Sequence, residues 1–163
     1  MAVVMDYPIL PDTAPSLRPS YLVRPVHWSD APYMEAAQGA AQVLRHGVVF
    51  QHGVTLCVGN LPLCAWGITP LWTGVGVIWL FRQSAEAMAA HALPVARTMR
   101  RVWAAWMSGH PYRWVECLIR EDDRLMHRLL PWLGFQWCCT KWHYGTDGTD
   151  CALFAWWEWE KEA

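Results

Sequence analysis

Apolar and polar residues follow two different periods along the chain, and each period predicts one kind of secondary structure. Apolar or alternating runs of strand length stand at residues 21–25, 54–58, 61–68, 75–81, 112–119, 136–144 and 150–159. Apolar residues three or four positions apart, or an alanine-rich body, predict helices at residues 32–46, 85–91, 94–107 and 123–133. This order of elements predicts one α+β domain.

Capping and turn residues set the expected ends of several elements. Ser29 and Asp30 are typical N-cap residues for the first helix, and Gly134 is typical of a residue that ends a helix. Gly59–Asn60 predicts a tight hairpin turn between two strands. Residues 69–74 contain proline and glycine and are expected to form a loop, with a buried central strand after it.

Two further helices begin after a side chain that can accept a backbone hydrogen bond. Ser84 precedes the short helix, and Asp122 or Asp123 precedes the last one. Pro131 lies in the last turn of that last helix, where it lacks a backbone donor. We therefore expect a distorted end to this helix.

Size and composition predict a single globule. The chain has 163 residues, of which 54% are hydrophobic and 17% are charged. Four prolines within residues 1–20 predict an extended arm, which leaves residues 21–163 as the domain. The longest apolar runs fall short of the roughly 20 residues that span a bilayer, and the first residues lack a secretory signal. We expect no membrane contact and a protein that acts in the cytoplasm where it is made.

Charge and cysteine spacing exclude two classes of function. The net charge is −1 and the basic residues are scattered, so no basic surface is expected for nucleic acid. The six cysteines have neither paired spacing nor histidines in register, which predicts reduced thiols and no metal site. Cys138 and Cys139 are adjacent on a predicted strand and should point to opposite faces, so at least one is expected in the core.

The thirteen tryptophans are the most unusual feature of the composition. Tryptophan is common both in aromatic cores and at the centres of interfaces. We expect most of them in the core. Trp156, Trp157 and Trp159 alternate along the last strand, so some of them must face outward. These three are the candidates for a surface that binds a partner.

Two segments resemble a known family in their residues as well as in their order. The first is Leu22-Val23-Arg24-Pro25 followed by Ser29-Asp30-Ala31, and the second is the helix after Asp123 that ends in Leu133-Gly134-Phe135. Over residues 21–159 the chain is similar to the GNAT superfamily of acyltransferases. The resemblance implies a GNAT-like fold, with a central mixed, mostly antiparallel sheet of six to seven strands flanked by about four helices.

The same resemblance identifies where an acyl-CoA cofactor would be held. The family cradles the cofactor's pyrophosphate with a Gln/Arg-x-x-Gly-x-Gly/Ala loop, which implies that Phe81, Arg82, Gln83 and Ser84 would contact acetyl-CoA. No glycine follows them here, and Glu86 would repel phosphate. The family's proton-donating tyrosine falls on Leu130, which cannot donate a proton.

Three hypotheses for function remain open at this point. The first is a non-catalytic GNAT-like protein without a cofactor, which binds other protein subunits and forms an oligomer. The hairpin at 54–67 and the segment His127–Gly134 resemble a small internal virion protein of short-tailed phages, which implies phage structural proteins as partners and a place in the phage particle or the host cytoplasm. The second is a divergent acetyl-CoA-dependent N-acyltransferase with Glu116 as general base. The third is an acyl carrier with Cys138 or Cys139 as nucleophile.

Overall fold

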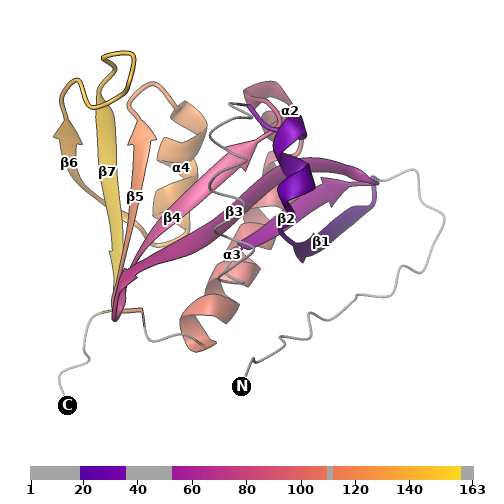
Figure 1. Cartoon of the computed structure of the whole chain (residues 1–163), viewed down its shortest axis with the longest axis horizontal. Helices are drawn as coiled ribbons and strands as arrows, with labels where there is room; N and C mark the ends of the chain where they lie inside the picture. Colours follow the sequence, from indigo (N-terminus) through magenta and orange to yellow (C-terminus); the bar gives the residue numbers. More distant parts are fainter. Residues whose placement is uncertain (1–18, 36–52, 110–111, 159–163) are drawn as a thin grey trace.

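The computed structural model describes residues 19–35, 53–109 and 112–158 (Figure 1). They form a seven-stranded mixed sheet flanked by four helices, which confirms the predicted α+β fold. The strand order is β1-β2-β3-β4-β5-β7-β6. The strands are β1 (Tyr21–Pro25), β2 (Gly53–Val58), β3 (Leu61–Trp72), β4 (Val75–Arg82), β5 (Trp114–Arg120), β6 (Gln136–Lys141) and β7 (Cys151–Trp157). The helices are η1 (Trp28–Tyr33), α2 (Ala85–Ala90), α3 (Ala92–Gly109) and α4 (Arg124–Trp132).

The parallel pairing of β4 with β5 divides the sheet into two halves. All other neighbouring strands are antiparallel. The register joins β4 to β5 at three positions only, from Val75↔Trp114 to Val77↔Glu116. Beyond this point the two strands diverge, as Figure 1 shows between the pink β4 and the orange β5.

The main core lies between one face of the sheet and helices α2, α3 and α4. Alternate residues of the strands face it, because successive side chains of a strand point to opposite faces. A smaller cluster on the other face contains Val26, Ala31, Met34 and Ala65, with Trp79 and Phe81 packed against it. Strand β4 therefore contributes Ile78 to the main core and its neighbour Trp79 to the other face.

The predicted N-cap Asp123 and the predicted terminator Gly134 are both confirmed for α4. Asp123 caps its first turn by accepting a hydrogen bond from the N–H of Met126 at 3.2 Å. At the other end the N–H of Phe135 donates to the carbonyl of Leu130 at 3.0 Å, and Gly134 has a positive φ of 94°. This is a Schellman motif, in which glycine adopts the left-handed conformation at no steric cost. Pro131 lies inside the helix, which ends one residue later.

The first helix differs from the prediction in its start and its type. It is a 3₁₀-helix, and its N-cap is His27 rather than Ser29 or Asp30. The carboxylate of Asp30 is turned inward, where it accepts hydrogen bonds from Arg24, from Thr55 and from the N–H of His27. Asp30 is only 1% exposed; it occupies the third position of the helix, where its bond from the His27 N–H completes a capping box, and it also binds Arg24 and Thr55 in the interior. The rest of the predicted helix, and residues 1–18 of the predicted arm, lie outside the described residues.

Two predictions about the central strands were wrong. Residues 69–72 continue β3 instead of forming a loop. Pro70 is tolerated there because β2 pairs with β3 only as far as Gly67, which leaves one edge of this stretch without a partner among the described strands; a bulge follows between Pro70 and Trp72. A shorter turn follows, with Gly74 at a φ of 78°. Strand β4 is only partly buried, since its second half has lost β5 as a neighbour.

The expectation that most tryptophans lie in the core was also wrong. Of the described tryptophans, Trp66, Trp103 and Trp106 are buried. Five are exposed: Trp28, Trp72, Trp132, Trp137 and Trp142. Trp28 and Trp132 lie on helices, Trp72 at the end of β3, Trp137 on the edge strand β6 and Trp142 in the loop after it. In the described part of the chain, no helix combines the length and apolar character needed to cross a membrane.

Candidate functional site

The divergence of β4 and β5 opens a cavity of about 380 Å³ between the two halves of the sheet. Residues of both strands line it on either side, and the start of α4 closes one end. The walls are largely apolar; they include Val77, Ile78, Trp79, Leu80, Phe81, Cys117, Leu118, Ile119 and Met126. Four charged residues, Glu35, Arg82, Arg120 and Asp123, complete the lining. The cavity is therefore an apolar cleft with a charged mouth.

The carboxylate of Glu35 is bound to the junction between β4 and α2. One oxygen accepts the backbone N–H of Ala85 at 3.2 Å, and the other accepts Nε of Arg82 at 3.1 Å. The backbone N–H of Glu35 donates in turn to the carbonyl of Arg82 at 2.7 Å. An internal anion thus contacts the first residue of α2, where β4 ends.

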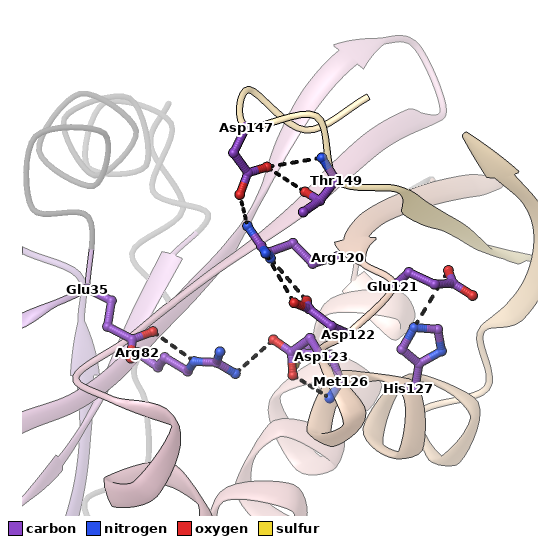
Figure 2. A network of polar contacts seen from close by, with 10 residues as sticks. All are labelled: Glu35, Arg82, Arg120, Glu121, Asp122, Asp123, Met126, His127, Asp147 and Thr149. Atoms are coloured by element: carbon purple, nitrogen blue, oxygen red, sulfur yellow. Dashed lines mark hydrogen bonds and ion pairs between the residues drawn. The ribbon is translucent and has the colours of Figure 1, made fainter. Parts of the chain in front are cut away.

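Arg82 lies between two carboxylates at the mouth of the cleft (Figure 2). Besides Glu35, its guanidinium donates to Asp123 at 2.8 Å, which ties the end of β4 to the start of α4. Burial alone would lower the pKa of Arg82, but the hydrogen bond to Glu35 and the charge of Asp123 outweigh it and raise the pKa. The arginine is permanently charged and is held between these two acids.

A second arginine repeats this arrangement on the other side of the cleft. Arg120 donates to Asp122 at 3.0 and 3.1 Å and to Asp147 at 2.6 Å. Asp147 also accepts the hydroxyl of Thr149 at 2.6 Å, and the hydrogen bonds from Thr149 and Arg120 lower its pKa. Figure 2 shows both networks across the mouth. Four carboxylates surround two guanidinium groups, so the two networks together carry excess negative charge; Asp122 and Asp147 lie outside the lining of the cleft itself.

The predicted cofactor residues are only partly brought to the cleft. Phe81 and Arg82 line it. The hydroxyl of Ser84 instead caps α2 by accepting the N–H of Ala87 at 3.0 Å, and the N–H of Gln83 donates to Leu63 of β3 at 2.8 Å. The backbone N–H of Gln83 and the hydroxyl of Ser84 are therefore already hydrogen-bonded within the protein.

Glu116, the candidate base, and Leu130, which stands where the family has its acid, both make contacts within the protein. Glu116 is half-buried, and its carboxylate accepts the indole N–H of Trp114 at 3.0 Å. It does not belong to the lining of the cleft. Leu130 is 1% exposed in the main core. A proton donor at that position would have to replace a packed core side chain.

The three candidate partner residues do not form one surface in the described structure. Trp156 packs against the main core, with its ring 5.6 Å from that of Trp103 and perpendicular to it. Trp157 is stacked on Trp114 across β5 and β7, with ring centres 5.4 Å apart. Trp159 lies outside the described residues. Their role in partner binding stays a prediction.

The adjacent cysteines contradict the expectation that one of them is buried. Both are exposed on the edge strand β6. A bulge between Trp137 and Cys139 inserts Cys138 as an extra residue, which breaks the alternation of faces. The pKa of the Cys138 thiol is raised, chiefly by partial burial, which disfavours the thiolate form that a nucleophile needs. Within the described ranges, no three His, Cys, Asp or Glu side chains are placed to hold a metal.

Three features of the site were not predicted from the sequence. They are the contacts of Glu35, the ion pair between Asp123 and Arg82, and the hydrogen bond from the N–H of Ala85 to Glu35. The contacts of Glu35 span 47 and 50 residues, and no local pattern indicates a contact at that separation. A partial signal does exist in Arg82-Gln83-Ser84-Ala85-Glu86-Ala87, which departs from the family's loop pattern only by Ala85 in place of its first glycine. The loop is therefore altered at one position rather than lost.

Comparison with known proteins gives a result for structure and none for sequence. No protein-family model matches the chain, and no curated protein matches its sequence. Ard1 from Thermoplasma volcanium is similar in structure, with a TM-score of 0.69, 13% identity, and coverage of 86% of this chain and 99% of that one. The putative acetyltransferase yncA from Salmonella typhimurium, solved with its cofactor acetyl-CoA, has a TM-score of 0.67 and 9% identity, covering 88% of this chain and 97% of its own.

A third solved structure gives the same result. The ribosomal-protein-S5-alanine acetyltransferase from Vibrio fischeri has a TM-score of 0.64 and 13% identity, covering 88% of this chain and 96% of its own. These identities are too low to carry over an activity, but each alignment covers at least 86% of this chain. The splayed β4–β5 pair, the strand order and these neighbours agree: the chain has the GNAT acetyltransferase fold.

Proposed function

We propose that this chain is an acetyltransferase-like protein that acts by binding another protein and not by acyl transfer. The observation that carries the proposal is the carboxylate of Glu35 on the N–H of Ala85 and on Arg82. In the GNAT fold this junction between β4 and the following helix holds the cofactor's pyrophosphate. Here the chain supplies its own anion at that place.

The residues at the junction do not fit the pyrophosphate of acetyl-CoA. A phosphate that approached the N–H of Ala85 would come close to the carboxylate of Glu35, and the two negative charges would repel each other. Arg82 offers no compensation, because two carboxylates already neutralise it. Ala85 also carries a side chain where the family's loop has a glycine that lets phosphate approach the backbone. We therefore propose that the protein has no acetyl-CoA cofactor.

The contacts at the reaction site support the same conclusion. Leu130 stands in the core where the family has its proton-donating tyrosine, and Glu116 is held by the indole of Trp114 outside the cleft lining. Partners would be other protein subunits. The predicted place in a phage particle has no support from the comparisons and stays a prediction.

A divergent N-acyltransferase is the second candidate, and one observation favours it. The cleft between β4 and β5 has largely apolar walls and a volume of about 380 Å³, at the lower end of the range for ligand pockets. A neighbour of the same fold was solved with acetyl-CoA. For such an enzyme, the cleft would bind the uncharged part of the cofactor, and Glu116 or a water would accept the proton of the amine substrate.

Calorimetric titration with acetyl-CoA and with CoA separates the two candidates. The proposal expects no saturable heat at millimolar ligand and no ligand-dependent rise in melting temperature. Saturable binding in the micromolar range would overturn it and favour the acyltransferase. A parallel titration with pantetheine, which lacks the nucleotide and the pyrophosphate, shows whether these phosphates limit any weak binding that is seen.

A further inference from the structure

The two strands that border the cleft have free backbone edges facing each other. Along its other edge β4 pairs with β3 as far as Arg82, and β5 pairs with β7 as far as Arg120. Toward each other they pair only up to Val77↔Glu116. The segments Ile78–Arg82 and Cys117–Arg120 therefore present strand edges to the cleft without a β-ladder partner among the described residues. Such edges are templates for an additional strand.

We infer that the cleft binds a short extended segment of a partner protein, which inserts between β4 and β5 as an additional strand. The inference rests on the proposed function, since a bound cofactor would fill the same space. Main-chain hydrogen bonds to a free strand edge give affinity, and the pockets beside the edge select side chains. Insertion here would join the two halves of the sheet.

The walls of the cleft select small apolar side chains. Alternate residues of an inserted strand point to opposite faces. One set would contact Ile78, Ile119 and Met126 on the helix side, and the other would contact Trp79 and Leu118 on the opposite face. The volume of about 380 Å³ admits only a few residues.

The mouth selects a basic residue at one end of the segment. Arg82 is shared by Glu35 and Asp123, and Arg120 is shared by Asp122 and Asp147. Each network carries one more carboxylate than guanidinium, so each has an excess negative charge. A lysine or arginine is attracted to this end of the cleft, whereas phosphate or an acidic peptide is repelled. The occupant is thus an apolar strand that ends in basic residues.

Fluorescence polarisation with defined peptides tests the inference. The probe is a labelled peptide of four valines followed by two lysines. A second peptide is methylated on alternate backbone nitrogens, which removes hydrogen-bond donors and keeps the side chains, and a third has glutamates in place of the lysines. We expect saturable binding of the first peptide and at least about tenfold weaker binding of the others, equivalent to about 1.4 kcal/mol. No binding of the first peptide, or equal binding of the methylated one, would overturn the inference.

A matched pair of variants locates the binding site. Leu118 and Leu61 are both exposed leucines on strands, at 37% and 57%, but only Leu118 lines the cleft. Leu118→Lys is expected to weaken peptide binding at least about tenfold, while Leu61→Lys leaves it unchanged. Equal effects of the two substitutions would place the peptide elsewhere and contradict the inference.

The acetyl-CoA titration keeps the two proposals apart. If neither acetyl-CoA nor the peptide binds, the proposed function stands and the inserted strand is excluded. If acetyl-CoA binds at micromolar concentration, the proposed function fails and the inference fails with it. Peptide binding without acetyl-CoA binding supports both.

Discussion

The carboxylate of Glu35 accepts the backbone N–H of Ala85 at 3.2 Å, although 50 residues separate the two in the sequence. The same carboxylate accepts Nε of Arg82 at 3.1 Å. A single acidic side chain thereby satisfies both the backbone donor and the cation that a bound anion would need. The contact explains how a chain can keep the fold of an acetyltransferase and still reject the charged part of its cofactor.

Removing this internal anion should increase the affinity for CoA. We expect the double variant Glu35→Ala with Ala85→Gly to bind CoA at least about tenfold more tightly than the unmodified protein in calorimetric titration, because Arg82 keeps one carboxylate partner and the backbone at residue 85 is freed. Glu121→Ala is the matched control: its side chain is as exposed as that of Glu35, at 48%, but its carboxylate lies 4.0 Å from Nε2 of His127 and forms no ion pair with Arg82. An equal gain in both variants would show that overall charge, and not Glu35, limits binding.

Asp123 has two roles, and two substitutions separate them. Asp123→Ala removes both the cap of α4 and the ion pair with Arg82, and should lower the free energy of unfolding by about 1–2 kcal/mol. Asp123→Asn keeps an acceptor for the N–H of Met126 and should cost less. Urea denaturation measures both, with Asp122→Ala as control at an exposed position outside the cap. Equal losses in the two Asp123 variants would contradict the capping role.

Stability at acid pH should depend on Asp30. Burial alone would raise its pKa, but hydrogen bonds from Arg24, Thr55 and the N–H of His27 outweigh burial and lower it. The pKa in the unfolded chain is about 3.9. The stabilisation is therefore complete above that value and is lost as the pH falls through the lower pKa of the folded state.

Asp30→Asn should cost about 3 kcal/mol at neutral pH, because Arg24 loses its charged partner. The difference in unfolding free energy between protein and variant should shrink below about pH 4. Denaturant titrations between pH 3 and 7 measure it. A constant difference over this range would show that Asp30 does not titrate as proposed.

Gly134 should resist substitution because of its backbone conformation. Its φ of 94° lies in the left-handed region, where a side chain is strained, although the nearest atom to an added Cβ would be Trp156 at 3.5 Å. Gly134→Ala is expected to lower the free energy of unfolding by about 1 kcal/mol, and Gly134→Asn by less, since asparagine tolerates this region better. Thermal melting compares them; an alanine variant as stable as the original would exclude strain at this position.

Thiol reagents should distinguish the cysteines by position. Cys138 and Cys139 are exposed, whereas burial raises the pKa of Cys64 and Cys117 to about 12. We expect Cys138 and Cys139 to be alkylated first and the buried thiols only after unfolding, as mass spectrometry of the labelled peptides would show. Early labelling of Cys64 or Cys117 would contradict the described packing. The variant with both exposed cysteines changed to serine should stay unlabelled in the folded state.

Most of the fold could be predicted from the sequence because its signals are local. Ser84 and Asp123 as caps, Gly134 as a helix end and Gly59–Asn60 as a turn all act within a few residues of their own position. The errors arose where distant contacts decide the structure. The sequence predicts Asp30 as the N-cap residue, but it lies three residues after the N-cap His27, because Arg24 and Thr55 hold its carboxylate in the interior.

The candidate site shows the same limit more strongly. Arg82 was identified because a family pattern includes it, but its two partners, Glu35 and Asp123, come from segments 47 and 41 residues away. The exposure of Cys138 depends on a bulge, which a strict alternation of faces cannot indicate. Chemistry that depends on pairs of distant residues requires the folded arrangement.

The three-residue joint between β4 and β5 has a mechanical consequence. Strands β1 to β4 form one half of the sheet and β5 to β7 the other. Only three paired positions, from Val75↔Trp114 to Val77↔Glu116, join the two halves, so this junction is the weakest part of the sheet. Under a pulling force, or in amide exchange with deuterium, the molecule should part there first and separate into two cooperative blocks. A ligand that binds to both β4 and β5 would hold the two blocks together, and they would then unfold in a single cooperative step.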